Sequence, residues 1–123
     1  MTRAAAGTHV LADLCGCERL SDLNWIEETL RLAAQAACAT VLEVRLHHFG
    51  PGMGVTGVAL LAESHISIHT WPETGQAAVD LFVCGPSAQV HDGLAVIASR
   101  LRGNVSCHHA ISRLVTPIGE IPA

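Results

Sequence analysis

Six segments of the chain carry the apolar patterns of β-strands. Residues 41–47 and 65–70 alternate apolar and polar positions, which is typical of a strand with one buried face. Residues 55–62 are nearly all apolar and predict a central strand. Pro72 is expected to end the strand over 65–70 or to place it at a sheet edge. The remaining predicted strands cover residues 8–14, 77–84 and 104–115.

This alternation also assigns side chains to faces, because successive residues of a strand point in opposite directions. In the strand over 41–47, the pattern predicts a buried face made of Leu42, Val44 and Leu46. In the strand over 65–70, the polar face consists of His65, Ser67 and His69. Along 77–84, one face is shared by Asp80, Phe82 and Cys84.

Two further segments have the spacing of helices. Ser21 and Asp22 offer an N-cap, and the apolar residues that follow at helical intervals predict a helix over 22–38. Those apolar positions are Leu23, Ile26, Leu30, Ala33 and Ala37. A second helix opens at Gly85-Pro86-Ser87, and its buried stripe is Val90, Leu94, Ile97 and Leu101.

The order of these elements is β-α-β-β-β-β-α-β. Runs of strands interrupted by two helices predict an α+β fold, a two-layer sandwich in which an antiparallel sheet carries both helices on one face. The length of 123 residues predicts one domain over 1–123. Only 3% of the residues are aromatic, so a small core is expected to be completed at a subunit interface.

Charge and cysteine content narrow the function classes. The formal net charge is −4 and no basic patch stands out, which argues against a nucleic-acid partner. No apolar run is long enough to span a bilayer, and the start of the chain lacks the apolar stretch of a secretory signal. Five cysteines at loose spacing do not predict a disulfide framework, so a cytoplasmic location is expected.

Candidate chemistry concentrates in residues 62–73, Ala-Glu-Ser-His-Ile-Ser-Ile-His-Thr-Trp-Pro-Glu. Glu63-Ser64 fits either an ordinary polar pair between two strands or a self-cleavage site. In the second case the Ser64 hydroxyl attacks the Glu63 carbonyl, and elimination and hydrolysis then leave a pyruvoyl group and ammonia. His69 is the candidate base. Ser64 and His69 have opposite parity, so Ser64 is expected at a turn or bulge before the strand.

Other residues near this motif fit either a structural or a chemical role. Thr56 lies between Gly54 and Gly57 and is either a plain strand residue or a hydrogen-bond partner of the rearranging ester. Cys84 ends a strand and is either a buried thiol or a proton donor. The chain has no lysine, so it cannot form the lysine Schiff base of pyridoxal enzymes. His47-His48, Cys107-His108-His109 and Cys15-Gly16-Cys17 have no metal-ligand spacing, and no metal is predicted.

With these motifs in view, the chain resembles the prokaryotic S-adenosylmethionine decarboxylases, which are pyruvoyl-dependent enzymes of polyamine synthesis. The resemblance runs from Gly7 to about Gly85 and more loosely beyond. It is carried by Gly7-Thr8-His9, His47-His48-Phe49, Gly54-Val55-Thr56-Gly57, Glu63 to Glu73 and Asp80 to Gly85.

The resemblance implies a proenzyme that cuts itself between Glu63 and Ser64 into a β chain, 1–63, and an α chain, 64–123. Ser64 would become the pyruvoyl group, on which the substrate amine forms a Schiff base without pyridoxal phosphate or metal. The other implied roles are processing for His69 and Thr56, proton donation for Cys84, and substrate binding for Phe49 and Glu73. The family also implies an α+β sandwich and a homodimer of αβ units, with active sites at or near the interface.

Two positions depart from the family pattern. Cys15 stands where members often carry Tyr or Trp, and Gln76 stands where they often carry Tyr. Aromatic stacking on a base contributes about 1–3 kcal/mol in comparable settings. The alternative interpretation is therefore a pyruvoyl-dependent decarboxylase of arginine or ornithine. A non-catalytic subunit with this fold would have lost Ser64, His69 or Cys84, and all three are present.

Overall fold

The computed structural model describes residues 4–62, 64–84 and 87–116. The element order is the predicted β-α-β-β-β-β-α-β. The elements are β1 (Ala4–Cys15), α1 (Leu23–Ala36), β2 (Val41–His48), β3 (Val55–Leu61), β4 (His65–Trp71), β5 (Gln76–Val83), α2 (Ser87–Arg100) and β6 (Asn104–Thr116). Within these described ranges, no helix is long and apolar enough to cross a membrane.

The six strands form one antiparallel sheet in the order β2-β3-β4-β5-β1-β6. β2 to β5 follow one another through short connections, and β1 inserts between β5 and β6. The first and last strands of the chain therefore lie side by side, and β2 and β6 are the two edges.

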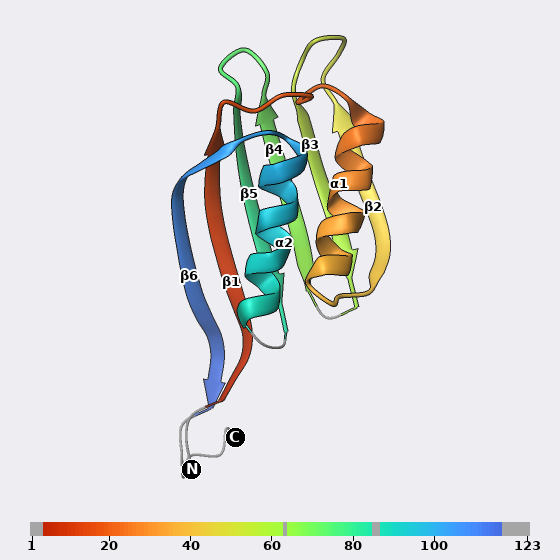
Figure 1. Ribbon diagram of the computed structural model, residues 1–123. Coiled ribbons are helices and arrows are strands. Elements are labelled where there is room, and N and C mark those ends of the chain that lie inside the picture. The colour runs from red at the N-terminus through yellow and green to blue at the C-terminus, as the bar shows by residue number, and fades with distance from the viewer. Residues whose placement is uncertain (1–3, 63, 85–86, 117–123) are drawn as a thin grey trace.

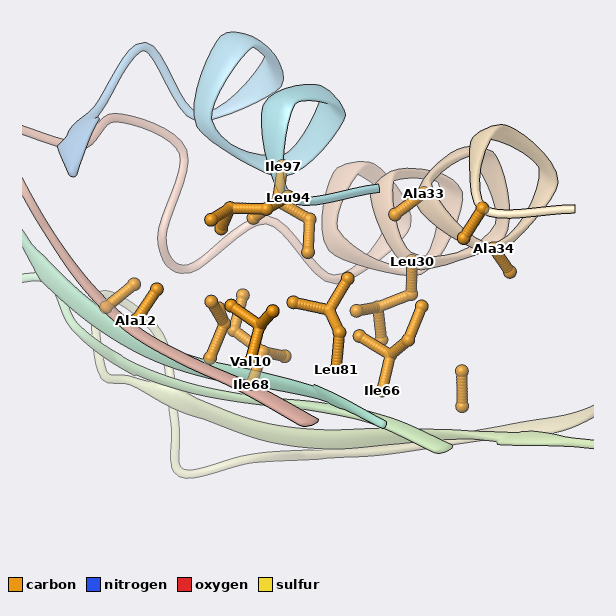
Figure 2. Packing of buried hydrophobic residues seen from close by; sticks show 14 of the residues in the cluster. Val10, Ala12, Leu30, Ala33, Ala34, Ile66, Ile68, Leu81, Leu94 and Ile97 are labelled. Carbon is orange, nitrogen blue, oxygen red and sulfur yellow. The ribbon is translucent and has the colours of Figure 1, made fainter. Parts of the chain in front are cut away.

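Both helices cover the same face of this sheet (Figure 1). α1 begins where the Asp22 carboxylate accepts a hydrogen bond from the Trp25 backbone N–H at 3.1 Å, the N-cap arrangement expected from the sequence. The core fills the space between the two layers (Figure 2). Strand residues such as Ile66, Ile68 and Leu81 meet helix residues such as Leu30 and Ile97, all fully buried.

The sheet has a second face that neither helix covers, and every other strand residue points toward it. Along β4, Ile66, Ile68 and Thr70 are buried, whereas the residues between them point to the opposite side. We call this second side the open face. Thr56 lies opposite His69 and Ser67 lies opposite Asp80 on this face, and the other polar residues alternate with buried ones along their own strands. The polar residues of the open face include His9, Thr56, His65, Ser67, His69 and Asp80.

One predicted face is wrong at a single residue. Leu42 is 66% exposed, although Val44 and Leu46 pack against the core as predicted. The pairing of β2 with β3 shifts register between Val41 and Glu43, so Leu42 lies at a bulge. A bulge changes the direction of the side chains on either side of it, which a simple alternation does not anticipate.

Candidate active site

Ser64 lies in the tight turn that joins β3 to β4. The Leu61 N–H donates to the Ser64 carbonyl at 2.9 Å, and the Ser64 N–H donates back to the Leu61 carbonyl at 3.4 Å. The Ala62 N–H donates to the Thr40 carbonyl at 2.9 Å, which fixes the turn against the segment after α1. Ser64 therefore precedes the strand, as its parity relative to His69 requires. Glu63 lies outside the described residues.

Cys84 opens into the same cavity as Ser64. This cavity has a volume of about 120 Å³. Its lining residues are Cys38, Ala39, Thr40, Leu61, Ala62, Ser64, Val83 and Cys84. Cys84 directly follows β5, and β5 pairs with β4, so the sheet brings the end of one strand beside the beginning of the other. Two of the predicted site residues thus line one cavity.

Thr56 and His69 form a second group on the open face. They are direct partners across β3 and β4, and the Thr56 hydroxyl lies 3.1 Å from His69 Nδ1, within hydrogen-bond distance. Together with Arg45, His47 and Ser67 they line a cavity of about 430 Å³. Thr56 is therefore positioned to orient the His69 ring.

The structure does not bring this second group to Ser64 within one chain. His69 follows Ser64 by five residues along an extended strand, and each residue advances about 3.3 Å, which separates the two by about 16 Å. Proton transfer requires heavy atoms about 3 Å apart. One copy of the chain therefore holds the residues expected to process Ser64, but not within reach of it.

Phe49 and Glu73 lie near the group formed by Thr56 and His69, on connections at the end of the sheet remote from Ser64 (Figure 1). Phe49 follows β2, is 59% exposed, and its ring centroid lies 4.6 Å from that of His47. Glu73 is exposed in the turn between β4 and β5. Both side chains are accessible to a ligand or to another protein chain.

A hydrogen-bond network on the open face was missed from the sequence. The Nε2 atoms of His9 and His65 lie 2.7 and 2.8 Å from Asp80 Oδ2, and Ser67 donates a hydrogen bond to Asp80 Oδ1. Partial burial alone would raise the pKa of Asp80, but the hydrogen bonds from Ser67, His9 and His65 and the charge of His65 lower it below its usual value. The alternation of β4 and β5 could have indicated part of this network, because it assigns His65 and Ser67 to one polar face of β4 and Asp80 to one face of β5. The contribution of His9 could not be predicted, because it depends on the pairing of β1 with β5.

The same network has donors that would suit a metal ion, since one atom each of His9, His65 and Asp80 lies within 4.8 Å of the others. Arg113 Nη1 lies 3.1 Å from His9 Nδ1. A guanidinium can only donate, so Nδ1 accepts and the ring proton resides on Nε2, where it donates to Asp80. Metal binding through Nε2 would move that proton to Nδ1, against Arg113. The geometry therefore favours hydrogen bonding at these three residues.

The two residues that depart from the family pattern lie at the end of the sheet remote from Ser64. Gln76 lines a cavity of about 370 Å³ with Asp13 and Trp71, and its Oε1 accepts a hydrogen bond from the Thr74 hydroxyl at 2.8 Å. Cys15 ends β1 and is half-buried. Burial and then the neighbouring Cys15 raise the pKa of the Cys17 thiol.

Comparison with known proteins identifies the family. The family model described as S-adenosylmethionine decarboxylase matches residues 8–114. The S-adenosylmethionine decarboxylase proenzyme of Methanococcus maripaludis is 49% identical over 117 residues, covering 94% of this chain and 95% of that protein. The corresponding proenzyme of Thermomicrobium roseum is 43% identical over 96 residues, covering 78% and 83%.

The fold agrees with a solved structure of the same description. The crystal structure of the adenosylmethionine decarboxylase from Aquifex aeolicus superposes with a TM-score of 0.84 at 33% sequence identity, covering 96% of this chain and 98% of that one. The matched region includes Ser64, Cys84, Thr56 and His69. The chain belongs to the S-adenosylmethionine decarboxylase family.

Proposed function

We propose that this protein, a self-processing S-adenosylmethionine decarboxylase of polyamine and spermidine biosynthesis, is cut between Glu63 and Ser64. The Ser64 Oγ attacks the Glu63 carbonyl carbon and converts the amide to an ester. Removal of the Ser64 α-proton expels the Glu63 carboxylate and leaves dehydroalanine, which water converts to a pyruvoyl group with release of ammonia. The products are 1–63 and 64–123, within a single domain. The tight turn at Ser64 supports this site, because it presents a hydroxyl beside a cavity.

The observation that carries the proposal is the cavity shared by Ser64 and Cys84. The pyruvoyl group of this family supplies a carbonyl that takes up the electron pair released when CO₂ leaves. A pyruvoyl group at position 64 fits this cavity of about 120 Å³, because the Cys84 thiol lines the same space. Cys84 would then return a proton to the α-carbon of the product.

We further propose that the functional unit is a homodimer of αβ units, in which each site is completed by the second copy. Within one chain, His69 and its partner Thr56 lie about 16 Å from Ser64, too far to act on it. The open face also exposes large apolar side chains, among them Leu11, Leu60 and Ile111. Burying such a face against a second copy would stabilise the pair and would provide the interface expected from the few aromatic residues.

Phe49 and Glu73 are the proposed substrate-binding residues. The exposed ring of Phe49 can stack on the adenine or lie beside the sulfonium of the substrate. The Glu73 carboxylate can accept hydrogen bonds from two ribose hydroxyls. Both residues lie at the end of the sheet that carries His69, so in the dimer they belong with the copy that supplies His69.

A cytoplasmic location is part of the same proposal. The five cysteines have no disulfide-framework spacing, and a proton-donating Cys84 needs a reduced thiol.

Intact mass under denaturing conditions tests the cut. The wild-type chain should give two fragments, and Ser64→Ala should leave one uncut chain. Ser106→Ala removes an exposed hydroxyl from β6 and should be cut normally. Cys84→Ala should be cut but should lose about 10²-fold or more in kcat for release of carboxyl-labelled CO₂. Cutting of Ser64→Ala would contradict the assignment of Ser64, and turnover of arginine or ornithine in place of S-adenosylmethionine would contradict the substrate.

A further inference from the structure

A further cavity lies at the opposite end of the helices from Ser64, where α1 begins and α2 ends (Figure 1). The Glu18 N–H donates to the Leu101 carbonyl at 2.7 Å and brings the loop after β1 against the end of α2. The cavity between them has a volume of about 530 Å³. We call it the arginine cavity; its lining residues are Glu18, Arg19, Trp25, Ser99, Arg100 and Arg102.

The arginine cavity gathers three guanidinium groups in an acidic protein. The chain has seven arginines, no lysine and a formal net charge of −4. Three of those seven arginines line this cavity, and each has one carboxylate within 3.9 Å, from Asp22, Glu28 or Glu18.

The carboxylates near these arginines do not saturate them. Arg102 lies 3.7 Å from Glu18, Arg19 lies 3.9 Å from Asp22, and Arg100 lies 3.4 Å from Glu28. In each pair the carboxylate side chain is well exposed. The Arg19–Asp22 and Arg102–Glu18 pairs are exposed on both sides, and such pairs contribute little. Each guanidinium has five N–H donors in a fixed fork, so donors remain for a ligand.

The backbone conformation of two of these arginines is a separate observation. Arg19 has φ of 60° and Arg102 has φ of 55°, both in the left-handed region that favours glycine. Arg102 is the second residue after α2, at the position past the helix end where glycine is usual, and the next residue is Gly103. Among the described residues four non-glycine positions have positive φ, and two of them are arginines of this cavity. At Arg102 this conformation belongs to the turn that ends α2, in which the Gly103 N–H donates to the Ala98 carbonyl at 2.9 Å. Arg19 holds it in a loop, and strained loop positions cluster at ligand-binding sites.

Trp25 fixes two of the three guanidiniums in place. The guanidinium carbons of Arg19 and Arg100 lie 4.0 and 3.8 Å from the Trp25 ring centroid. Arg100 Nε also donates to the buried Thr29 hydroxyl at 2.9 Å, and the Trp25 indole N–H donates to the Arg100 carbonyl at 2.9 Å. Side chains that are already ordered lose less entropy when a ligand binds.

We propose that the arginine cavity binds the phosphate group of a small phosphorylated molecule. The three guanidiniums keep N–H donors beyond those that face their carboxylates, and arginine forks bind phosphate oxygens in pairs. The volume of about 530 Å³ lies within the usual range of small-molecule sites and leaves room for an organic part beside the phosphate. The Ser99 hydroxyl supplies one further hydrogen-bonding group.

Calorimetric titration of the self-processed protein tests this site, with inorganic phosphate and glycerol phosphate as probes at constant ionic strength. Each should bind saturably with one site per chain. Arg102→Gly should weaken binding about 10-fold or more through loss of charge-assisted hydrogen bonds. The same change should leave the melting temperature equal or higher, because glycine adopts the positive φ without strain. A merely damaged fold would instead lower it.

Two control variants test whether the effect of Arg102→Gly comes from loss of a charge within the cavity, and not from loss of any surface charge or from relief of a positive φ. Arg45→Gln removes a positive charge from exposed β2, outside the cavity, and should bind phosphate like the wild type. Cys38→Gly relieves positive φ at a residue without charge and should also bind normally. The proposal is overturned if no saturable binding is seen up to about 10 mM phosphate, if Arg102→Gly binds normally, or if Arg45→Gln loses as much affinity. Tighter binding of malonate than of phosphate would overturn the assigned ligand class.

Discussion

Asp80 accepts hydrogen bonds from two imidazoles and a hydroxyl on the open face, and this environment lowers the pKa of its carboxyl. In the uncut Ser64→Ala background, Asp80→Asn should therefore reduce the free energy of unfolding at neutral pH by about 1–3 kcal/mol. A depressed folded-state pKa stabilises the native state above the unfolded-state value of about 3.9 and loses this effect as pH falls through the folded value.

The difference in urea midpoint between Asp80→Asn and its parent should accordingly be full near pH 7 and shrink below about pH 4. Asp13→Asn is a matched control, because Asp13 is an exposed acid of the same face, and its effect should stay within about 0.5 kcal/mol. A difference that grew on acidification would mean that Asp80 is not stabilised as a carboxylate.

At the scale of elements, Gly93 of α2 lies close against the backbone of α1. A Cβ at this position would lie 3.0 Å from the Ala33 backbone carbonyl oxygen of α1 and 3.0 Å from a methyl group of Leu81. Alanine normally favours a helix over glycine by about 1 kcal/mol. Because the contacting atom belongs to the backbone of α1, overpacking should win, and Gly93→Ala should destabilise the uncut chain by about 1–2 kcal/mol in urea unfolding.

Ala95→Gly provides the comparison for that experiment. Ala95 lies on α2 and is exposed, so the change should cost about 1 kcal/mol by helix propensity alone. If Gly93→Ala instead raised the urea midpoint, α1 and α2 would have to separate slightly without loss of packing.

Periodicity was sufficient to predict all eight elements, because each buries one regular stripe. It was insufficient at Leu42, where a bulge interrupts the alternation, and it placed the start of β1 at residue 8 although the strand begins at Ala4. Pairing between β1 and β6 accounts for that extension, and strand partners are not encoded in the local pattern. Thr70 shows the same limit: its buried hydroxyl donates to the Leu20 carbonyl and accepts from the Val55 N–H.

The candidate site was predictable in its residues but not in its arrangement. Ser64, His69, Thr56 and Cys84 could be named from one motif and its neighbours, since their chemistry depends on residue type. Their division into two groups about 16 Å apart depends on the length of β4. Residues that are close together in a sequence motif are expected to lie close together in space. In an extended strand, however, residues five positions apart lie in different parts of the sheet.

At the scale of the whole molecule, the separation of Ser64 from His69 predicts that processing requires a second copy. His69→Ala chains keep Ser64, and Ser64→Ala chains keep His69, so each should stay uncut when produced alone. When the two are produced together, a mixed dimer contains one pairing of an intact Ser64 with an intact His69 from the other chain. Fragments should then arise from the His69→Ala chain only.

Intact mass identifies which chain is cut, because a short peptide tag on one chain gives the two sets of fragments different masses. Co-production of His69→Ala with a chain that carries both substitutions is the matched control, since no pairing in that mixture contains an intact His69. Cutting of His69→Ala chains in the control, or their failure to be cut beside Ser64→Ala chains in demonstrated mixed dimers, would contradict processing across the pair. If cutting is restored in the test mixture and not in the control, the second copy supplies the His69 that acts on Ser64. The proenzyme would then mature only after its open face has bound a second copy of the chain.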